Sequence, residues 1–209
     1  MAKRGSYAKG VAKREEILTR ALDVIAREGF RGASVREIAD AVGLSQAGLL
    51  HYFGSKEQLF VEILRKRDEV DAGQFDPQTV QLDPMREGYL QVIRHNSEVP
   101  GVVELFSRLA VEASDVEHPA HAFFLERSAA IRHLFAETIA PEQEAGRMSD
   151  RVDAETLARI FQAVADGMQL QWLLDRDVDM AATVDALFQL LTPVQAPAPA
   201  SASASPSAG

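Results

Sequence analysis

The sequence of residues 34–57 is SVREIADAVGLSQAGLLHYFGSKE, which has the pattern of two short helices joined by a bend. Ser34 is a favourable N-cap, and a glutamate three residues later completes a capping box. Gly43 stands where the first helix must end and the backbone must turn with a positive φ. Ser45 is a second N-cap, and the helix that it opens ends at Gly54. The sequence therefore predicts a helix-turn-helix.

Small residues at the start of the second helix give this motif a function. In a helix-turn-helix, the N-terminal end of the second helix reads bases in the DNA major groove. Short side chains at that end of residues 45–53 allow the backbone to approach the base edges. Gln46 can pair with adenine N6 and N7, and Ala47 can contact a thymine methyl group. The pattern favours DNA binding over the alternative of an ordinary helical hairpin.

Residues 11–61 resemble the N-terminal domain of the tetracycline-repressor (TetR) family of bacterial transcription regulators, and a weaker resemblance extends to about residue 191. The matching residues are Ser34, Ile38, Ala39, Gly43, Leu44, Ser45, Leu49, His51, Tyr52, Phe53, Ser55, Lys56 and Glu57. The resemblance implies that Tyr52 and Lys56 contact phosphates and that Ser34 touches the DNA backbone. The DNA-binding residues that we predict are Ser34, Ser45, Gln46, Ala47, Gly48, His51, Tyr52 and Lys56.

Two positions depart from the family pattern. Gly48 stands where the family usually has threonine, and Leu50 stands where it usually has tyrosine. Gly48 removes a hydroxyl contact to DNA, and Leu50 removes a ring that often packs on sugar and phosphate. These departures change the expected reading of individual bases and leave the expected docking in the groove unchanged.

The charge is divided unevenly along the chain. Residues 1–67 contain 13 Lys and Arg against 8 Asp and Glu, whereas the remaining residues contain 9 against 23. A basic head on an acidic body is expected when only one domain meets phosphate. We interpret residues 1–10 as a flexible basic arm that faces DNA, the alternative being a solvated leader. Together with the residues after it, the arm carries the basic side chains Lys3, Arg4, Lys9, Lys13 and Arg14.

The periodicity of apolar residues predicts an all-α chain with two domains. Residues 11–55 form the helix-turn-helix domain with a helix over 12–29, and residues 56–72 form a connecting helix. Residues 73–192 form a helical domain for ligand binding and dimerisation. Its helices are expected at about 85–98, 102–114, 119–140, 153–174 and 179–191, with a loop or link at 73–84. Residues 193–209 contain mainly Ala, Pro, Ser and Gly and are expected to be disordered.

Arg127 is an anomaly in the helix predicted over residues 119–140. It falls in the middle of an apolar face, where a guanidinium must be paired or must line a polar cavity. A pair with Glu or Asp of a neighbouring helix is the favoured interpretation, and an anchor for an acidic ligand is the alternative. The candidate pocket lining, which could equally be core, is Tyr89, Phe106, Phe123, Phe124, Arg127, Met168 and Trp172.

The helix predicted over residues 153–174 is apolar on two faces, whereas a surface helix needs only one. One face would pack against its own domain and the other against a second copy of the chain. Ala163 and Gly167, four residues apart, would allow a close approach of the backbones. The predicted interface of the homodimer is Ala163, Gly167, Leu170, Leu174, Val184, Leu187, Phe188 and Leu191.

Other classes of protein find little support. The chain has no Cys, which fits a reducing cytosol, and no apolar run long enough to cross a membrane. His118 and His121 lack a third ligand at a metal-site spacing, so we expect no metal and no cofactor. A helical-bundle enzyme would need inward Glu-x-x-His pairs or a nucleophile beside a base. A nucleoid-type binder that ignores sequence would not need an acidic helical body.

The sequence therefore predicts a cytoplasmic, non-enzymatic transcription regulator. A single recognition helix meets few bases, so we expect a homodimer on a pseudo-palindromic operator. The family resemblance implies repression that is relieved when a small-molecule effector binds the C-terminal domain. The identity of the effector and the sign of the regulation are not predictable from the residues.

Overall fold

The structure is a computed structural model that describes residues 2–73 and 81–192, with only the backbone described for residues 2–8 and 31. The described residues form nine α-helices and no strand, so the all-α prediction is confirmed. The predicted disordered tail at 193–209 lies outside the described residues. The helices are α1 Ala2–Gly32, α2 Val35–Ala41, α3 Gln46–Phe53, α4 Lys56–Ala72, α5 Leu82–Glu98, α6 Pro100–Glu112, α7 His121–Glu144, α8 Ala154–Leu174 and α9 Met180–Leu191.

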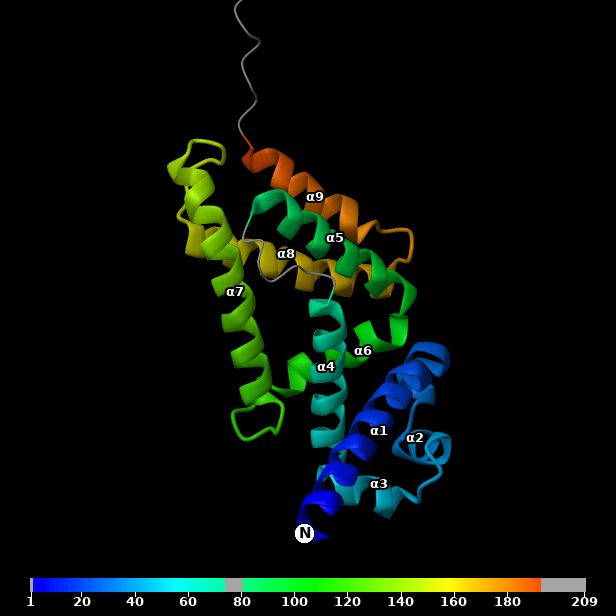
Figure 1. Cartoon of the computed structure of the whole chain (residues 1–209). Helices are drawn as coiled ribbons and strands as arrows, with labels where there is room; N and C mark the ends of the chain where they lie inside the picture. The colour runs from blue at the N-terminus through cyan, green and yellow to red at the C-terminus, as the bar shows by residue number, and fades with distance from the viewer. Residues whose placement is uncertain (1, 74–80, 193–209) are drawn as a thin grey trace, which may run out of the picture.

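The head consists of α1, α2, α3 and the first turns of α4 (Figure 1). Its core is built from residues that the sequence places on the inner faces, among them Ile17, Ile38 and Leu49, which are fully buried. The same apolar cluster continues into α6 through Leu105 and Phe106. The core of the head therefore extends into α6, which packs along α1.

The body consists of α5, α7, α8 and α9, with α6 between it and the head. Its core centres on three phenylalanines, Phe135 of α7, Phe161 of α8 and Phe188 of α9. The rings of Phe161 and Phe188 lie 4.2 Å apart between centroids, a distance at which aromatic pairs attract each other. Packing of α7 against α8 and of α5 against α9 therefore produces a second core of its own.

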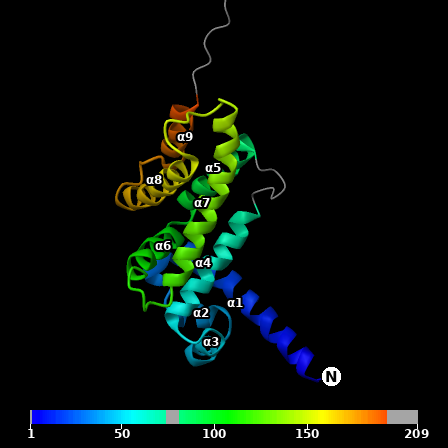
Figure 2. The same ribbon diagram turned by 90° about the vertical axis from the view of Figure 1, so that its left-hand side faces the viewer.

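The structure of the N-terminal residues differs from the prediction. Residues 1–10 were expected to form a flexible arm, but α1 begins at Ala2 and runs to a kink at Gly29, whose φ is 73°. Ala, Lys and Arg are strong helix formers, and they outweigh the two glycines of this segment. The first turns of α1 extend away from the rest of the molecule (Figure 2).

Other helix boundaries also differ from the predictions, among them the start of α5 and the end of α7. α5 begins at Leu82, three residues earlier than expected, because Pro84 is tolerated in the first turn of a helix. α7 continues through Pro141 to Glu144 instead of ending at residue 140. A proline this close to a C-terminus removes a single backbone hydrogen bond, and the following turn is retained.

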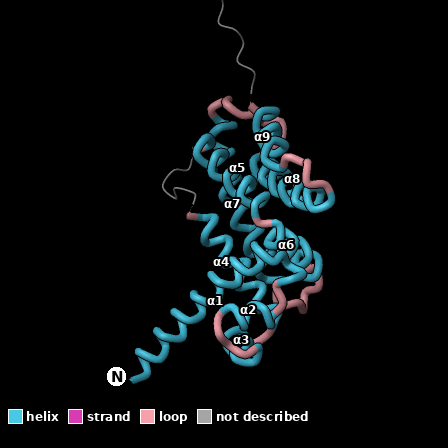
Figure 3. The backbone as a smooth tube through the Cα atoms, turned by 90° about the vertical axis from the view of Figure 1, so that its right-hand side faces the viewer, coloured by secondary structure: helices cyan, strands magenta, loops and turns pink. Residues whose placement is uncertain are grey.

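The molecule is elongated, with α3 at one end and α8 and α9 toward the other (Figure 3). α4 runs between these ends and connects the head to the body (Figure 1). No helix within the described residues has both the length and the apolarity that crossing a bilayer requires.

Candidate DNA-binding surface and internal cavity

The turn between α2 and α3 has the geometry that the sequence predicts. Ser34 Oγ accepts a hydrogen bond from the N–H of Glu37, and the Glu37 carboxylate accepts one from the N–H of Ser34 at 3.0 Å. Gly43 has a φ of 67°, in the left-handed region that favours glycine. The N–H of Leu44 then donates to the carbonyl of Ala39 at 2.9 Å. These contacts fix the angle between the two helices.

α3 has one buried face and one exposed N-terminal turn. Leu49 and Phe53 are buried in the head, whereas Ser45, Gln46 and Ala47 are exposed. Ser45 Oγ accepts the N–H of Gly48 at 3.0 Å, which leaves the Gln46 side chain free of the cap. The side chains that the sequence assigns to base reading thus lie on the surface of a well-anchored helix.

The other predicted DNA-binding residues lie on α3 and at the starts of its neighbours. Lys56 is exposed at the first residue of α4, and its ammonium lies 5.5 Å from the centroid of the Phe60 ring. His51 and Ser34 are exposed, and Tyr52 is half-buried with its side chain packed against the head core. None of these side chains is enclosed within the head.

Arg14 has a structural role that differs from the predicted basic arm. Its guanidinium donates to the backbone carbonyl of Tyr52 and lies 4.5 Å from the centroid of the Phe53 ring. A second nitrogen lies 3.3 Å from a carboxylate oxygen of Glu62 on α4. Arg14 therefore ties α1 to the end of α3 and to α4, and its charge is already paired. Lys13 pairs with its neighbour Glu16 at 2.8 Å.

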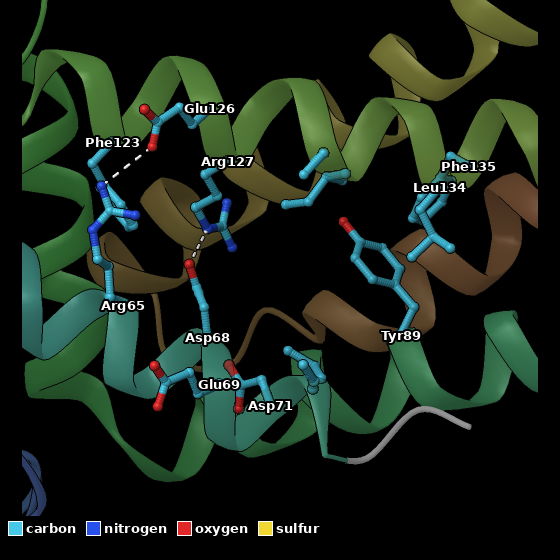
Figure 4. A pocket seen from close by; sticks show the side chains of 14 residues that line it. Arg65, Asp68, Glu69, Asp71, Tyr89, Phe123, Glu126, Arg127, Leu134 and Phe135 are labelled. Carbon is cyan, nitrogen blue, oxygen red and sulfur yellow. Dashed lines mark hydrogen bonds and ion pairs between the residues drawn. The ribbon is translucent and has the colours of Figure 1, made fainter. Parts of the chain in front are cut away.

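A cavity of about 570 Å³ lies in the body between α4, α5 and α7 (Figure 4). Its walls are mainly apolar, with Phe123, Ile131, Leu134 and Phe135 from α7. Tyr89 of α5 points its hydroxyl into this space (Figure 4), and burial raises the pKa of that hydroxyl. The side chain therefore stays neutral and can exchange hydrogen bonds with a bound molecule.

Charged side chains of α4 and α7 contact each other at the wall of the cavity. Asp68 accepts a 2.7 Å hydrogen bond from Arg67 and a 2.9 Å hydrogen bond from Arg127. The two guanidinium carbons each lie 4.9 Å from the centroid of the Phe106 ring. Arg127 is therefore paired with an aspartate of a neighbouring helix, which is the interpretation favoured from the sequence.

The predicted pocket lining is divided between several environments. Tyr89, Phe123 and Arg127 line the cavity, and Phe124 lines an adjacent space of about 300 Å³ that also reaches Phe106. The other two predicted lining residues pack in the body core and line neither of these two spaces. They are Met168, with 6% of its surface exposed, and Trp172, also with 6%. Their helix faces inward at both positions, so the residues pack against their own domain.

The predicted dimer interface is also divided. Ala163, Leu170 and Leu174 lie on the outer surface of α8, with 90% of Leu174 exposed. Gly167, Leu187 and Leu191 are partly exposed. The prediction is wrong for two residues of α9, which are buried in the body core and cannot meet another chain. They are Val184, with no exposed surface, and Phe188, with 2% exposed.

Several polar residues around the cavity escaped the sequence analysis. Asp68 and Asp71 lie on α4, Asn96 on α5, and Asp166 and Gln169 on α8. The signal that was available is an aspartate and a glutamine three residues apart within an otherwise apolar segment of α8. These residues are brought around Arg127 only by the packing of helices that are distant in sequence.

Comparison with known proteins identifies the family. The profile of the family described as "Bacterial regulatory proteins, tetR family" matches residues 17–63, which cover the helix-turn-helix. The HTH-type transcriptional repressor AcnR of Corynebacterium efficiens is 31% identical over 167 residues, which are 76% of this chain and 81% of AcnR. The chain belongs to the tetR family.

Solved structures extend the likeness to the fold of the whole chain. A tetR-family transcriptional regulator from Agrobacterium tumefaciens superposes with a TM-score of 0.66 at 21% identity, over 88% of this chain and all of that one. The transcriptional repressor FadR of Thermus thermophilus, in complex with lauroyl-CoA, gives 0.58 at 20% identity, over 89% and 98%. This tetR-family protein is therefore a DNA-binding transcription regulator with an N-terminal helix-turn-helix and a C-terminal helical domain.

Proposed function

We propose that this regulator is a repressor that binds a pseudo-palindromic operator as a homodimer and leaves it when a small molecule fills the cavity. The single observation that carries the DNA-binding part is the exposed first turn of α3 on a helix whose opposite face is buried. In this arrangement Gln46 and Ala47 read bases, and Ser34, Tyr52 and Lys56 hold phosphates. The repressor AcnR, which is similar over most of its length, supports the sign of the regulation.

The outer face of α8 supports the homodimer. Ile160, Ala163, Gly167, Leu170 and Leu174 fall along one side of this helix, and none of them is buried in the monomer. A contiguous apolar stripe of this kind usually marks a contact surface. Burial of the same stripe on two copies gives a twofold interface, which places two α3 helices on successive half-sites.

The cavity supports the response to a small molecule. Its volume of about 570 Å³ is within the range of sites that enclose drug-sized ligands. It lies beside α4, the helix that begins with Lys56 and ends against the body. A ligand that fits one arrangement of α4 and α7 better than another shifts the population of DNA-competent heads.

The test compares two single variants on an operator duplex and on random duplex over a range of salt concentrations. Gln46→Ala is expected to reduce discrimination between the duplexes by about 1–3 kcal/mol, because a base contact is lost. Lys56→Ala is expected to weaken both duplexes similarly and to lower the salt slope by about one. Equal loss of discrimination in both variants would contradict the division of roles between these residues.

A further inference from the structure

A small polar recess of about 40 Å³ adjoins the cavity on its α8 side. It shares four lining residues with the cavity, Tyr89, Val92, Arg127 and Ile131, so the two spaces are neighbours along the same walls. α8 adds Asp166 and Gln169 to the recess, and α5 adds Asn96. The volume holds only a few water-sized groups, so the recess suits the polar end of a molecule whose larger part fills the cavity.

Two buried oxygen atoms in the lining of the recess have no hydrogen-bond donor among the described residues. They are Asn96 Oδ1 and Gln169 Oε1, and each of these two residues has 8% of its surface exposed. The Gln169 amide donates its own N–H to Asp166 at 3.4 Å, so its oxygen is directed elsewhere. Buried carbonyl oxygens without a donor cost stability, and they are satisfied when a molecule with N–H groups enters.

The charges around the recess have an acidic excess. The buried cluster contains three carboxylates, Asp68, Asp71 and Asp166, and two guanidinium groups, Arg67 and Arg127. Both guanidinium groups contact Asp68, and Arg67 also lies 3.7 Å from Asp71. Asp166 forms no ion pair with any described residue.

Burial raises the pKa of both Asp71 and Asp166, because the nearby arginines do not compensate for the loss of water. A buried carboxylate without a counter-ion reduces stability at neutral pH. A cationic ligand would remove that cost at Asp166, whereas an anionic ligand would add a further negative charge to the cluster. Arg127 offers little to an anion, since Asp68 already neutralises it at 2.9 Å.

We propose that the effector of this regulator is a protonated amine with an apolar body, whose ammonium enters the recess beside Asp166, Asn96 and Gln169. An ammonium carries up to three N–H donors, which match one carboxylate and two carbonyl oxygens. Tyr89 lines both spaces, so its ring lies where the ammonium and the apolar body of such a ligand would meet. The apolar body lies against Phe123, Ile131 and Phe135 in the cavity (Figure 4). This inference rests on the proposed role of the cavity as the effector site.

The test uses three probes with nearly the same shape and different charge: 4-phenylbutylamine, 4-phenylbutanol and 4-phenylbutyrate. Their dissociation constants are measured by calorimetry with the full-length dimer, and operator release is followed by fluorescence anisotropy. The amine is expected to bind at least tenfold more tightly than the alcohol, and the carboxylate more weakly than both. The amine is also expected to release the operator at the lowest concentration.

Asp166→Asn is expected to reduce the affinity for the amine at least tenfold, to the level of the alcohol, and to leave the alcohol unchanged. This variant should fold, because a neutral amide replaces a carboxylate whose charge is unfavourable in its buried position. Its thermal unfolding midpoint provides the check. Asp150→Asn, at an exposed position outside the cavity, is the matched control and should change neither affinity.

Equal binding of amine and alcohol, tighter binding of the carboxylate, no binding of any probe, or a preference for the amine that survives Asp166→Asn would each overturn the inference. Operator binding without any probe is measured in the same series. If it is retained while the inference fails, the proposed function as a DNA-binding regulator stands. If the operator is not bound, the proposed function itself fails.

Discussion

Gly101→Ala tests how closely α6 packs against α1 at the edge of the head core. Gly101 lies in the first turn of α6, where this helix crosses the C-terminal part of α1. A Cβ atom at this position would lie 2.2 Å from the carbonyl oxygen of Ile25, 2.8 Å from Gly29 Cα and 3.0 Å from the backbone nitrogen of Phe30. All three neighbours are backbone atoms, so no side chain can rotate out of the way.

The magnitude follows from these distances. Relieving the contact with the Ile25 carbonyl requires α6 to move by about 1 Å, and such overpacking costs about 1–3 kcal/mol. Alanine favours a helix over glycine by up to about 1 kcal/mol, which offsets part of that cost. From the middle of the overpacking range and the full preference for alanine, the net loss is about 1 kcal/mol, which lowers the midpoint of thermal unfolding by about 2–4 °C for a chain of this size.

The assay is thermal unfolding followed by circular dichroism at one fixed protein concentration, because dimerisation makes the midpoint depend on concentration. Gly10→Ala is the matched control, since no atom lies within 4 Å of a Cβ placed at this position of α1. The control should raise the midpoint or leave it unchanged. If Gly101→Ala behaved like Gly10→Ala, the close approach of α6 to α1 would not exist as described.

Two further variants test the body. Burial raises the pKa of Asp71, so folding binds a proton at this carboxyl and its ionised form destabilises the protein above that pKa. Asp71→Asn should therefore raise the free energy of unfolding at pH 7, and this gain should shrink as the pH falls toward 4. A lower free energy of unfolding at pH 7 would contradict the prediction, because it would show that the attraction between Asp71 and Arg67 outweighs the cost of burial. Leu174→Glu should weaken the dimer by at least about 3 kcal/mol, roughly 100-fold, since two exposed leucines per dimer lose their apolar contacts. Analytical ultracentrifugation measures this, with Leu125→Glu on α7 as control, and equal dissociation constants would exclude the α8 face as the interface.

The sequence predicted best where the determinants are local. The capping box at Ser34, the left-handed turn at Gly43 and the cap at Ser45 each depend on residues within four positions of each other. Such signals fix the helix-turn-helix without knowledge of the rest of the chain. Helix ends near Pro84 and Pro141 were placed too far inward, because proline ends a helix only in some positions.

The site in the body depends on packing that periodicity does not reveal. α8 has apolar residues on two faces, and the face with Ala163, Leu170 and Leu174 is the exposed one, as the sequence predicts. Met168 and Trp172 of α8 were predicted to line a pocket, and Val184 and Phe188 of α9 to lie in the dimer interface, but all four pack in the body core. The partner of Arg127 is Asp68, 59 positions earlier, and only the crossing of α4 and α7 brings the two together.

The pair of Asp68 and Arg127 also explains how occupancy of the cavity can reach the DNA-binding surface. Asp68 lies twelve positions after Lys56 on α4, so the rigid helix separates them by about 18 Å. The first turns of α4 are embedded in the head core through Leu59 and Phe60, so the head must follow α4 when the helix tilts. A cation placed beside Asp166 would repel the guanidinium of Arg127. It would also attract the carboxylate of Asp68, which joins α4 to α7 through that guanidinium. Two ion pairs among the described residues join α4 to α7, Asp68–Arg127 at 2.9 Å and Arg65–Glu126 at 3.3 Å. Binding in the recess would act on the first of these, and a tilt of α4 would change the spacing of the two α3 helices in a dimer.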